Sequence, residues 1–125
     1  MLLEVYTYYQ ALKTGYFDDV ACNYRFSYGD GRLVNELDVI LTKGFRTIIM
    51  ECKGKTEVNV DTIYKLDSIV CQIGIAPVKV LVTKDRSAMK GGTAERGKLL
   101  QVITVSDEEI SKIGEILIKK LEAMA

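Results

Sequence analysis

Two long apolar segments joined by one short glycine-bearing turn constrain the fold more than any other feature of this sequence. Residues 33–42 are rich in Leu, Ile and Val, residues 46–53 contain two Ile and a Met in succession, and Gly44 and Phe45 belong to the turn between them. A two-residue turn with glycine in first position joins antiparallel strands, because glycine adopts positive φ angles without strain. Directly paired residues in such a hairpin have numbers that add up to the same total as those of the two turn residues. The pattern therefore predicts a β-hairpin in which Asp38 lies opposite Glu51.

The segment before this hairpin predicts a third strand. Between residues 20 and 28, apolar and aromatic residues alternate with polar ones, which is the two-residue period of a strand with one covered face. Gly29 to Gly31 is a turn signal between this segment and the next. We therefore expect the three strands to form an antiparallel meander.

Helical spacing of apolar residues predicts one helix on each side of the meander. The first spans residues 2–13 and ends before Gly15. The second follows Gly54, has Asn59 or Asp61 as its cap and ends at Gly74. The apolar positions are Leu2, Val5, Tyr6, Tyr9 and Leu12 in the first helix, and Ile63, Leu66, Ile69, Val70 and Ile73 in the second.

The C-terminal half predicts two further strands and two further helices. Residues 78–83 are almost all apolar, as in a strand covered on both faces, and a polar loop at 84–92 follows. A short helix at 93–100 and a brief strand at 101–104 precede a last helix, which opens with Ser106 and Glu109 as a capping box. The last helix is expected to bury Ile110, Ile113, Leu117 and Leu121. Residues 1–125 thus form a single α/β domain, a mixed sheet flanked by helices.

Composition excludes several classes of protein. The 125 residues include 17 basic and 17 acidic ones, so there is no net charge to attract nucleic acid or an anionic membrane at long range. No segment approaches the roughly 20 continuous apolar residues of a membrane helix, and the N-terminus lacks a signal-peptide pattern. Cys22, Cys52 and Cys71 lie among apolar residues, as reduced core thiols do. We therefore expect a cytoplasmic protein without membrane contact.

The absence of histidine limits the chemistry that the chain can perform. Ser-His-Asp and Cys-His nucleophiles are excluded, and so are zinc and iron sites with histidine ligands. Any catalysis must rest on carboxylates, lysines and tyrosines. A metal bound by carboxylate and carbonyl oxygens would be a hard cation such as Mg²⁺ or Mn²⁺.

One group of charged residues stands out on the predicted hairpin. Glu51 and Lys53 lie two positions apart on one strand and therefore share a face, in a segment where charge is costly to bury unless it is paired or metal-bound. Asp38, on the apolar neighbouring strand, is expected to have its Cβ ~5 Å from that of Glu51. Two carboxylates at this distance repel each other unless a cation lies between them. That cation is either a metal ion, with the carbonyl oxygen of Cys52 as a further ligand, or the Lys53 ammonium in a purely structural salt bridge; the spacing leaves both interpretations open.

The same segments resemble a known nuclease family. The NELDV segment at 35–39 and the ECK motif at 51–53 are similar to the core of the PD-(D/E)xK nuclease superfamily. More narrowly, they resemble the C-terminal nuclease domain of CRISPR ancillary nucleases, in which a CARF domain senses a cyclic oligoadenylate. The resemblance runs from residue 3 to about residue 100 and includes residues 3–6, 63–67 and 79–83. Leu37 stands where the motif has its nominal proline.

The resemblance implies a restriction-endonuclease-like fold, in which parallel strands follow the antiparallel meander, and a role for each matching residue. Asp38 and Glu51 would bind the metal, and Lys53 would be the catalytic lysine. Glu4 matches an acidic residue that joins the metal site, although a glutamate in a first helical turn also interacts favourably with the helix dipole. Lys65 matches a helix position that faces the site, although a solvated surface lysine fits the same pattern.

The function implied by the resemblance is metal-dependent cleavage of DNA or RNA phosphodiesters, within a CRISPR-linked defence effector whose CARF-like sensor is absent from these residues. Such nucleases are commonly dimers, and the tyrosine-rich first strand offers a surface for a homodimer. One alternative is a standalone nuclease similar to Holliday-junction resolvases. Such resolvases are expected to carry a more positive net charge than this chain does. Another is a non-catalytic interaction module of the same fold. A Rossmann-like ligand binder is disfavoured, because no GxGxxG loop follows a strand.

A basic cluster late in the chain is the candidate contact with the nucleic-acid backbone. Together with Tyr8 and Tyr64 it could line a groove for that backbone, whereas each residue alone also fits a solvated loop or helix face. The cluster consists of Lys84, Arg86, Lys90, Arg96 and Lys98.

Overall fold

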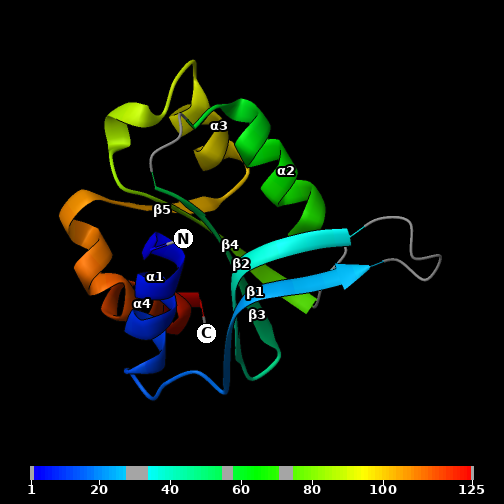
Figure 1. Cartoon of the computed structure of the whole chain (residues 1–125), viewed down its shortest axis with the longest axis vertical. Helices are drawn as coiled ribbons and strands as arrows, with labels where there is room; N and C mark the ends of the chain where they lie inside the picture. The colour runs from blue at the N-terminus through cyan, green and yellow to red at the C-terminus, as the bar shows by residue number, and fades with distance from the viewer. Residues whose placement is uncertain (1, 28–33, 55–57, 71–74, 125) are drawn as a thin grey trace.

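The chain forms one five-stranded sheet between two layers of helices (Figure 1). The structure is a computed structural model, and it describes residues 2–27, 34–54, 58–70 and 75–124. The strands are β1 (Asp19–Ser27), β2 (Val34–Lys43), β3 (Arg46–Lys53), β4 (Ile75–Thr83) and β5 (Val102–Ser106). The helices are α1 (Leu2–Leu12), α2 (Val60–Val70), α3 (Thr93–Leu99) and α4 (Ile113–Met124), with 3₁₀ turns η1 (Arg86–Ala88) and η2 (Asp107–Lys112).

The sheet has the mixed topology that the sequence predicts. Its strand order is β1-β2-β3-β4-β5, so every strand lies beside its neighbours in the sequence. The first three strands pair antiparallel, and the β3–β4 and β4–β5 pairs are parallel. The crossover helices α2 and α3 connect the parallel strands, as parallel pairing requires. The predicted α/β fold, an antiparallel meander followed by parallel strands, is confirmed.

Each face of the sheet has its own hydrophobic core. On one face, α1 and α4 pack on alternate residues of the central strands, among them Val39, Met50 and Val80. On the other face, α2 packs through Ile63, Leu66, Ile69 and Val70 on a second set, which includes Ile49 and Leu81. A central strand that is buried on both faces has a continuous run of apolar residues. This explains why residues 78–83 are almost all apolar.

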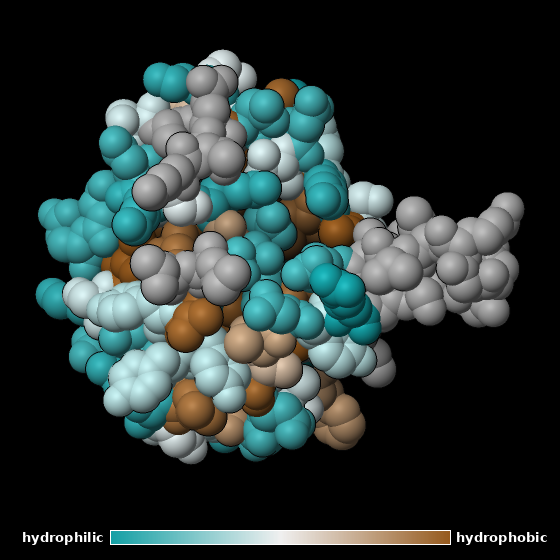
Figure 2. Space-filling model, in the orientation of Figure 1, coloured by the Kyte–Doolittle hydropathy of each residue, from teal (hydrophilic) through white to brown (hydrophobic). Residues whose placement is uncertain are grey.

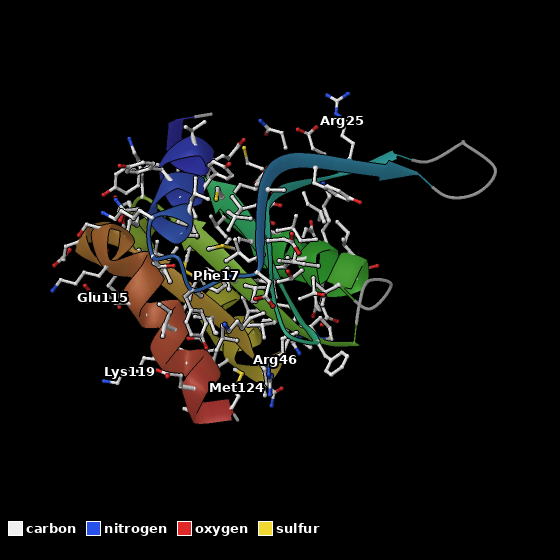
Figure 3. The ribbon with its side chains drawn as sticks, turned by 90° about the horizontal axis from the view of Figure 1, so that it is seen from below. Phe17, Arg25, Arg46, Glu115, Lys119 and Met124 are labelled. Carbon is white, nitrogen blue, oxygen red and sulfur yellow. The ribbon has the colours of Figure 1, made fainter. Side chains whose placement is uncertain are left out.

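The turn at Gly44 fixes the register of the β2–β3 hairpin. Gly44 has a φ of +61°, and its N–H donates to Asp18 Oδ2 at 2.7 Å. Phe45, the second turn residue, is 90% exposed. The pairs run from Lys43–Arg46 at the turn to Val39–Met50, which is the register that the sequence predicts. At the same end of the molecule, the Arg46 guanidinium donates to the carbonyl oxygen of Met124 at 3.2 Å and ties α4 to the hairpin (Figure 3).

Helix α1 is present as predicted, but its apolar stripe does not face the core. Val5, Tyr6, Tyr9 and Leu12 are exposed. The buried side of α1 consists of Leu3, Thr7, Gln10 and Ala11. The helical period was read correctly from the sequence, whereas the usual link between an apolar stripe and the interior fails for this helix. Neither α1 nor any other helix in the described ranges is long and apolar enough to cross a membrane.

The remaining elements follow the sequence with small differences. Asn59 is the cap of α2, because its Oδ1 accepts from the N–H groups of Asp61 and Thr62 at 3.0 and 3.3 Å. The Ser106–Glu109 capping box is present, but it opens η2 before α4 begins. The last helix and η2 bury all four expected residues: Ile110, Ile113, Leu117 and Leu121. The predicted turn at 29–31, Ile73 and the stop at Gly74 lie outside the described residues.

The loop at 84–92 is tied to the segment before α2. Val58 and Met89 form an isolated parallel bridge, and the N–H of Lys90 donates to the Val58 carbonyl oxygen at 2.9 Å. Val58 is fully buried, so the bridge also closes the core beneath α2. The sequence predicts this loop only as a polar, glycine-bearing segment and gives no sign of its pairing.

The close approach of α1 and α4 depends on Gly114, which gives a first testable prediction. A Cβ at Gly114 would lie 2.5 Å from Thr14 Cγ2 and 3.1 Å from the Gln10 carbonyl oxygen. Thr14 cannot easily rotate away, because its Oγ1 donates to Ala11 O at 2.7 Å and accepts from the N–H of Tyr16. We expect Gly114→Ala to lower the free energy of unfolding by about 1–3 kcal/mol, measured by urea denaturation.

Gly97→Ala is the matched control for this prediction. Gly97 is also a buried glycine within a helix, but its Cβ would meet Ile63 Cδ1 at 3.7 Å, which is ordinary contact. This substitution should be neutral or stabilising by up to about 1 kcal/mol, because alanine favours helix. Equal effects of the two substitutions would contradict the close packing of α1 on α4.

Candidate active site

Glu51 and Lys53 share the face of β3 that looks toward α2. Their neighbours Met50 and Cys52 are buried in the core beneath α1 and α4, on the opposite face. Lys53 Nζ lies 3.4 Å from Glu51 Oε1, and the two side chains are 33% and 18% exposed. The shared face that the spacing predicts is confirmed, and it carries a half-buried ion pair.

Asp38 meets these residues where the pairing of β2 and β3 ends. The last paired residues are Val39 and Met50, and Asp38 and Glu51 come next on the two strands. Instead of continuing the ladder, the N–H of Cys52 donates to Asp38 Oδ2 at 2.8 Å. The N–H and C=O of one strand residue point to the same edge, as in a hydrogen-bonded antiparallel pair. The Cys52 carbonyl oxygen therefore also faces the β2 side, next to Asp38.

A local distortion of β2 accompanies this change. Leu37 packs in the core beneath α2, whereas Val39, two residues later, packs in the core beneath α1 and α4. A regular strand would place both on one face. Opposite Asp38 on β1 lies Asn23, whose φ is +53°, a conformation that asparagine adopts more readily than most residues. At Asp38, the side chains of β2 therefore change the face of the sheet on which they lie. The register between β1 and β2 is the same before and after this point, so no residue is inserted.

The other two predicted residues approach from the helices. Lys65, on α2, lines a small cavity of about 170 Å³ together with Glu51 and Lys53. Glu4 lies on α1, in the layer that covers the opposite face of the sheet. Its carboxylate and that of Asp38 repel each other, which places Glu4 close to the end of the hairpin. The structure therefore brings all five predicted residues to one end of the β2–β3 hairpin.

The carboxyl groups of Glu51, Asp38 and Glu4 all have raised pKa values. Burial raises the pKa of Glu51 above its usual value, and repulsion by Asp38 raises it further. Burial also raises the pKa of Asp38, against the hydrogen bond from Cys52 and the attraction of Lys53, which lower it. The pKa of Glu4 is raised by burial and then by Asp38. Lys53 and Lys65 only partly offset these effects, so the site favours an additional cation or proton.

The donor set fits a hard cation, although the side chains do not converge on one point. Within the described part of the chain, no three acidic or cysteine side chains surround a position for a metal ion. The Asp38 carboxylate is turned toward the Cys52 N–H. The groups nearby are carboxylate and carbonyl oxygens, the ligands that Mg²⁺ and Mn²⁺ prefer.

Comparison with known families gives the arrangement a context. The family model for the Card1-like endonuclease domain matches residues 1–124. The chain belongs to the Card1-like endonuclease domain family. The expected resemblance to the nuclease domain of CRISPR ancillary nucleases is thereby confirmed, and this Card1-like domain is assigned to the nucleases. No match was found among curated protein sequences.

Solved structures share the fold of this Card1-like domain. Protein VC1899 from Vibrio cholerae is 22% identical with a TM-score of 0.75, over 98% of this chain and 33% of that one. Can2 from Sulfobacillus thermosulfidooxidans, solved with cyclic tetra-adenylate, is 20% identical with a TM-score of 0.73, over 94% and 32%. The protein of unknown function AF1548 is 11% identical with a TM-score of 0.60, over 85% and 58%. The chain thus spans about a third of the length of VC1899 and Can2.

The start of α2 supplies site residues that the sequence interpretation missed. Asn59, Asp61 and Thr62 line the same cavity as Glu51 and Lys53. The sequence marked Asn59 and Asp61 only as possible helix caps. A signal was available, because a capped helix that begins seven residues after Lys53 in a parallel crossover starts near the end of that strand.

The basic cluster does not form one groove. The Arg86 guanidinium donates to Ser106 Oγ at 3.0 Å and to Glu109 Oε1 at 3.1 Å, so it joins η1 to the start of η2. Arg96 lies over the ring of Tyr64, 5.7 Å from its centroid, beside the site helix. Tyr8 is partly buried and packs against the core beneath α1 and α4. These basic residues are close together in the sequence, which suggested a single surface. The turns between them, which the sequence did not predict, direct them to different places.

The raised pKa of Glu51 gives a second prediction, on stability. A carboxylate with a native pKa above its unfolded value binds more protons in the folded state, so its charge destabilises the fold at neutral pH. Glu51→Gln should therefore raise the thermal unfolding midpoint by a few degrees at pH 7 without divalent cations, measured by calorimetry. The gain should shrink as the pH falls into the range where the wild-type carboxyl becomes protonated.

The control is Glu115→Gln on α4, an exposed residue in the far helix layer, which should leave the midpoint unchanged. A lower midpoint for Glu51→Gln would mean that its ion pair with Lys53 stabilises the fold more than burial and the neighbouring carboxylates oppose it.

Proposed function

We propose that this Card1-like domain is a divalent-metal-dependent endonuclease that hydrolyses phosphodiester bonds of DNA or RNA. The observation that carries the proposal is the opening of the hairpin at Asp38, where a half-buried Glu51–Lys53 pair adjoins two further carboxylates. A purely structural salt bridge would leave three carboxylates with raised pKa values at one end of the sheet. This arrangement lowers stability, and it is typical of functional sites.

Asp38, Glu51 and the Cys52 carbonyl oxygen are the proposed ligands of Mg²⁺ or Mn²⁺, with Glu4 as a further acidic ligand. When bound, such an ion polarises a phosphodiester and lowers the pKa of water. Ligand binding requires the Asp38 carboxylate to share its lone pairs between the Cys52 N–H and the ion, which a carboxylate with two oxygens can do. The Cys52 hydrogen bond then orients Asp38 in the way that outer partners orient metal ligands.

Lys53 is the proposed catalytic lysine. Its ammonium group lies beside Glu51 and points into the same cavity as Lys65 and the start of α2. There it can orient a water molecule and stabilise the negative charge that develops on the phosphoryl oxygens. Lys65 is exposed and borders the same cavity, so we assign it to contact with a substrate phosphate.

The wider context is also a proposal. Can2 was solved with cyclic tetra-adenylate, and this chain matches about a third of its length. Together with the resemblance to CARF-linked nucleases, this supports a role as the cutting module of a CRISPR-linked defence effector. Cleavage would then be controlled by a sensor domain that binds a cyclic oligoadenylate.

Cleavage assays give the third prediction. The chain should cut plasmid DNA, single-stranded DNA or RNA with Mn²⁺ and not with EDTA. Glu51→Gln and Lys53→Met should each reduce the rate by about 10²–10⁴-fold, in line with the loss of a catalytic acid–base or charge-stabilising group. Glu115→Gln on α4 is the control and should cut like the wild type. Cleavage that persists in EDTA, or that is indifferent to Glu51→Gln, would refute the proposal.

Metal binding is tested separately, as the fourth prediction, because an isolated cutting module can require its activator. Mn²⁺ should raise the thermal midpoint in a concentration-dependent way, by mass action on the folded state. Asp38→Asn should abolish this shift, although its side-chain oxygen still accepts from the Cys52 N–H. An equal Mn²⁺ response in wild type and Asp38→Asn would favour the structural salt bridge, and with it a non-catalytic module.

A further inference from the structure

Strand β5 lies at one edge of the sheet, and part of its main chain is open to a further strand. It comes last in the strand order and pairs with β4. The N–H of Ser106 donates to Glu109 Oε1 at 3.3 Å, so it points away from β4. Because the main-chain groups of successive strand residues point alternately to the two sides, those of Thr104 and Val102 also face outward. No helix or loop within the described ranges bonds to these outward groups.

The open part of this edge is short, because the end of β5 is closed by side chains. The Arg86 guanidinium donates to Ser106 Oγ and to Glu109 Oε1, and Glu109 Oε1 accepts from the N–H of Ser106 as well. These bonds occupy the edge at Ser106. An edge that is blocked at one end does not pair with long strands at random, and it leaves room for one short extended segment.

A groove of about 480 Å³ runs beside the open part of β5. Side chains of an added strand would point alternately to the two faces of the sheet, and both faces offer apolar contacts there. Ile116 lies on α4, whereas Met89 packs on the core beneath α2. The apolar and uncharged lining consists of Met89, Ala94, Gln101, Val102, Ile103, Thr104, Ile116 and Met124.

The groove carries an excess of positive charge. Lys98 and Lys120 line it and are exposed, and neither forms an ion pair within the described part of the chain. The one carboxylate in the lining, that of Glu109, is already paired with Arg86 at 3.1 Å. Lys98 comes from α3, which packs beside α2, and Lys120 comes from α4, which covers the opposite face. One unbalanced lysine therefore stands on each side of the edge.

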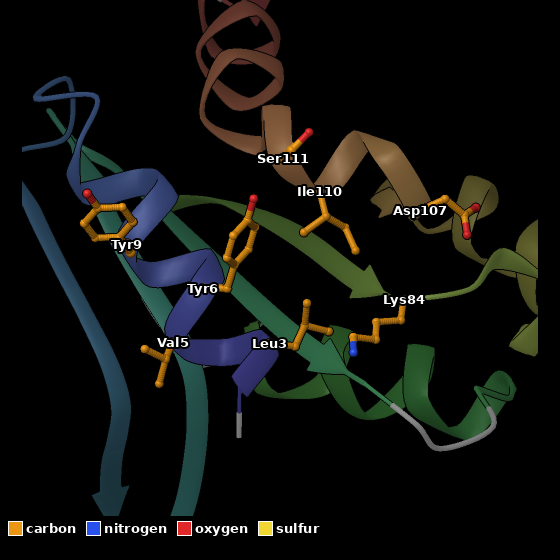
Figure 4. Close-up of a pocket in the computed structure, with 8 residues that line it drawn as sticks. All are labelled: Leu3, Val5, Tyr6, Tyr9, Lys84, Asp107, Ile110 and Ser111. Atoms are coloured by element: carbon orange, nitrogen blue, oxygen red, sulfur yellow. The ribbon is translucent and has the colours of Figure 1, made fainter.

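The groove between α1 and η2 is larger, at about 630 Å³, but its charges do not select a partner (Figure 4). Its lining is mostly apolar, and its two charged residues, Lys84 and Asp107, have opposite signs. Figure 2 shows brown, hydrophobic residues among pale ones over the region where Figure 1 places α1. Charge complementarity therefore favours the β5 edge as a docking surface.

We propose that the β5 edge binds an extended acidic segment of another protein, which adds to the sheet as a further strand. Main-chain bonds to Val102 and Thr104 hold the segment, and its carboxylates on the two faces meet Lys98 and Lys120. In strand addition of this kind, the main chain provides affinity and the alternate side chains provide specificity. Because β4 separates β5 from β3, the candidate active site remains open. The proposal does not depend on whether the domain cleaves nucleic acid.

The first experiment is fluorescence anisotropy with a labelled peptide of about nine residues, in which pairs of glutamates alternate with pairs of valines. The wild-type chain should bind it with a dissociation constant of about 10–100 μM. The double variant Lys98→Glu/Lys120→Glu should weaken binding by more than about tenfold, since it places like charges opposite each other. Both lysines are exposed, so the circular dichroism spectrum and the thermal midpoint should not change.

The matched control is Lys119→Glu, which should bind the peptide like the wild type. Lys119 is an exposed lysine on α4, next to Lys120, but it projects from the outer side of the helix and does not line the groove (Figure 3). A peptide with lysines in place of the glutamates should not bind. If Lys119→Glu weakens binding as much as the double variant does, the peptide responds to net charge alone and the proposal is wrong.

A second experiment separates strand addition from attraction between charges. Two versions of the peptide carry N-methyl groups at alternate residues, in the two possible phases. One phase should abolish binding and the other should leave it unchanged, because only one set of N–H groups can face β5. Equal effects of the two phases would overturn the proposal. It would also be overturned if the peptide does not bind at about 1 mM, or if oligothymidine displaces it and requires the same two lysines, because the groove would then hold a phosphate backbone.

Discussion

The hydrogen bond from the Cys52 N–H to the Asp38 carboxylate determines how this end of the molecule is built. It occupies the position where the next backbone pair of the β2–β3 ladder would form. A side chain that replaces a ladder partner satisfies the donor while it lets the two strands part. The opened end leaves room for Glu51 and Lys53 toward α2, and for Glu4 from α1. The Cys52 carbonyl oxygen faces the same side, so a main-chain oxygen and an acidic side chain are positioned together.

The parts of the structure that the sequence predicted well are those controlled by local geometry. The register around Gly44 followed from a two-residue turn, because such a turn leaves the pairing no freedom. The shared face of Glu51 and Lys53 followed from the two-residue period of a strand. The approach of Glu4 and Lys65 came from family resemblance, since no local pattern connects residues 4 and 65 with a hairpin. That resemblance now has the support of the family match.

The failures have a common physical cause, which is that the sequence pattern does not say what a surface packs against. The apolar stripe of α1 marked a helix but not its orientation, because the chain buries Thr7 and Gln10 on the inner side and leaves Tyr6 and Tyr9 outside. The basic residues from Lys84 to Lys98 looked like one patch, but Arg86 and Lys98 line one cavity and Lys84 lines another. Asn59 and Asp61 looked like caps, and they are also the wall of the site cavity. In each case, tertiary packing gave these residues a second role or turned them in a direction that the sequence pattern does not indicate.

The bridge between Val58 and Met89 has a consequence for how this domain can vary among its relatives. Asn59, just before α2, borders the candidate site, and its neighbour Val58 is hydrogen-bonded to Lys90 in the segment after β4. The two segments are separated in the sequence, but these bonds hold them together as one structural unit. A transplant of either segment alone from a homologue would break the shared main-chain bonds and expose the buried Val58. Replacements in one of these segments should therefore be accompanied by compensating replacements in the other. In evolution, the two segments should change together.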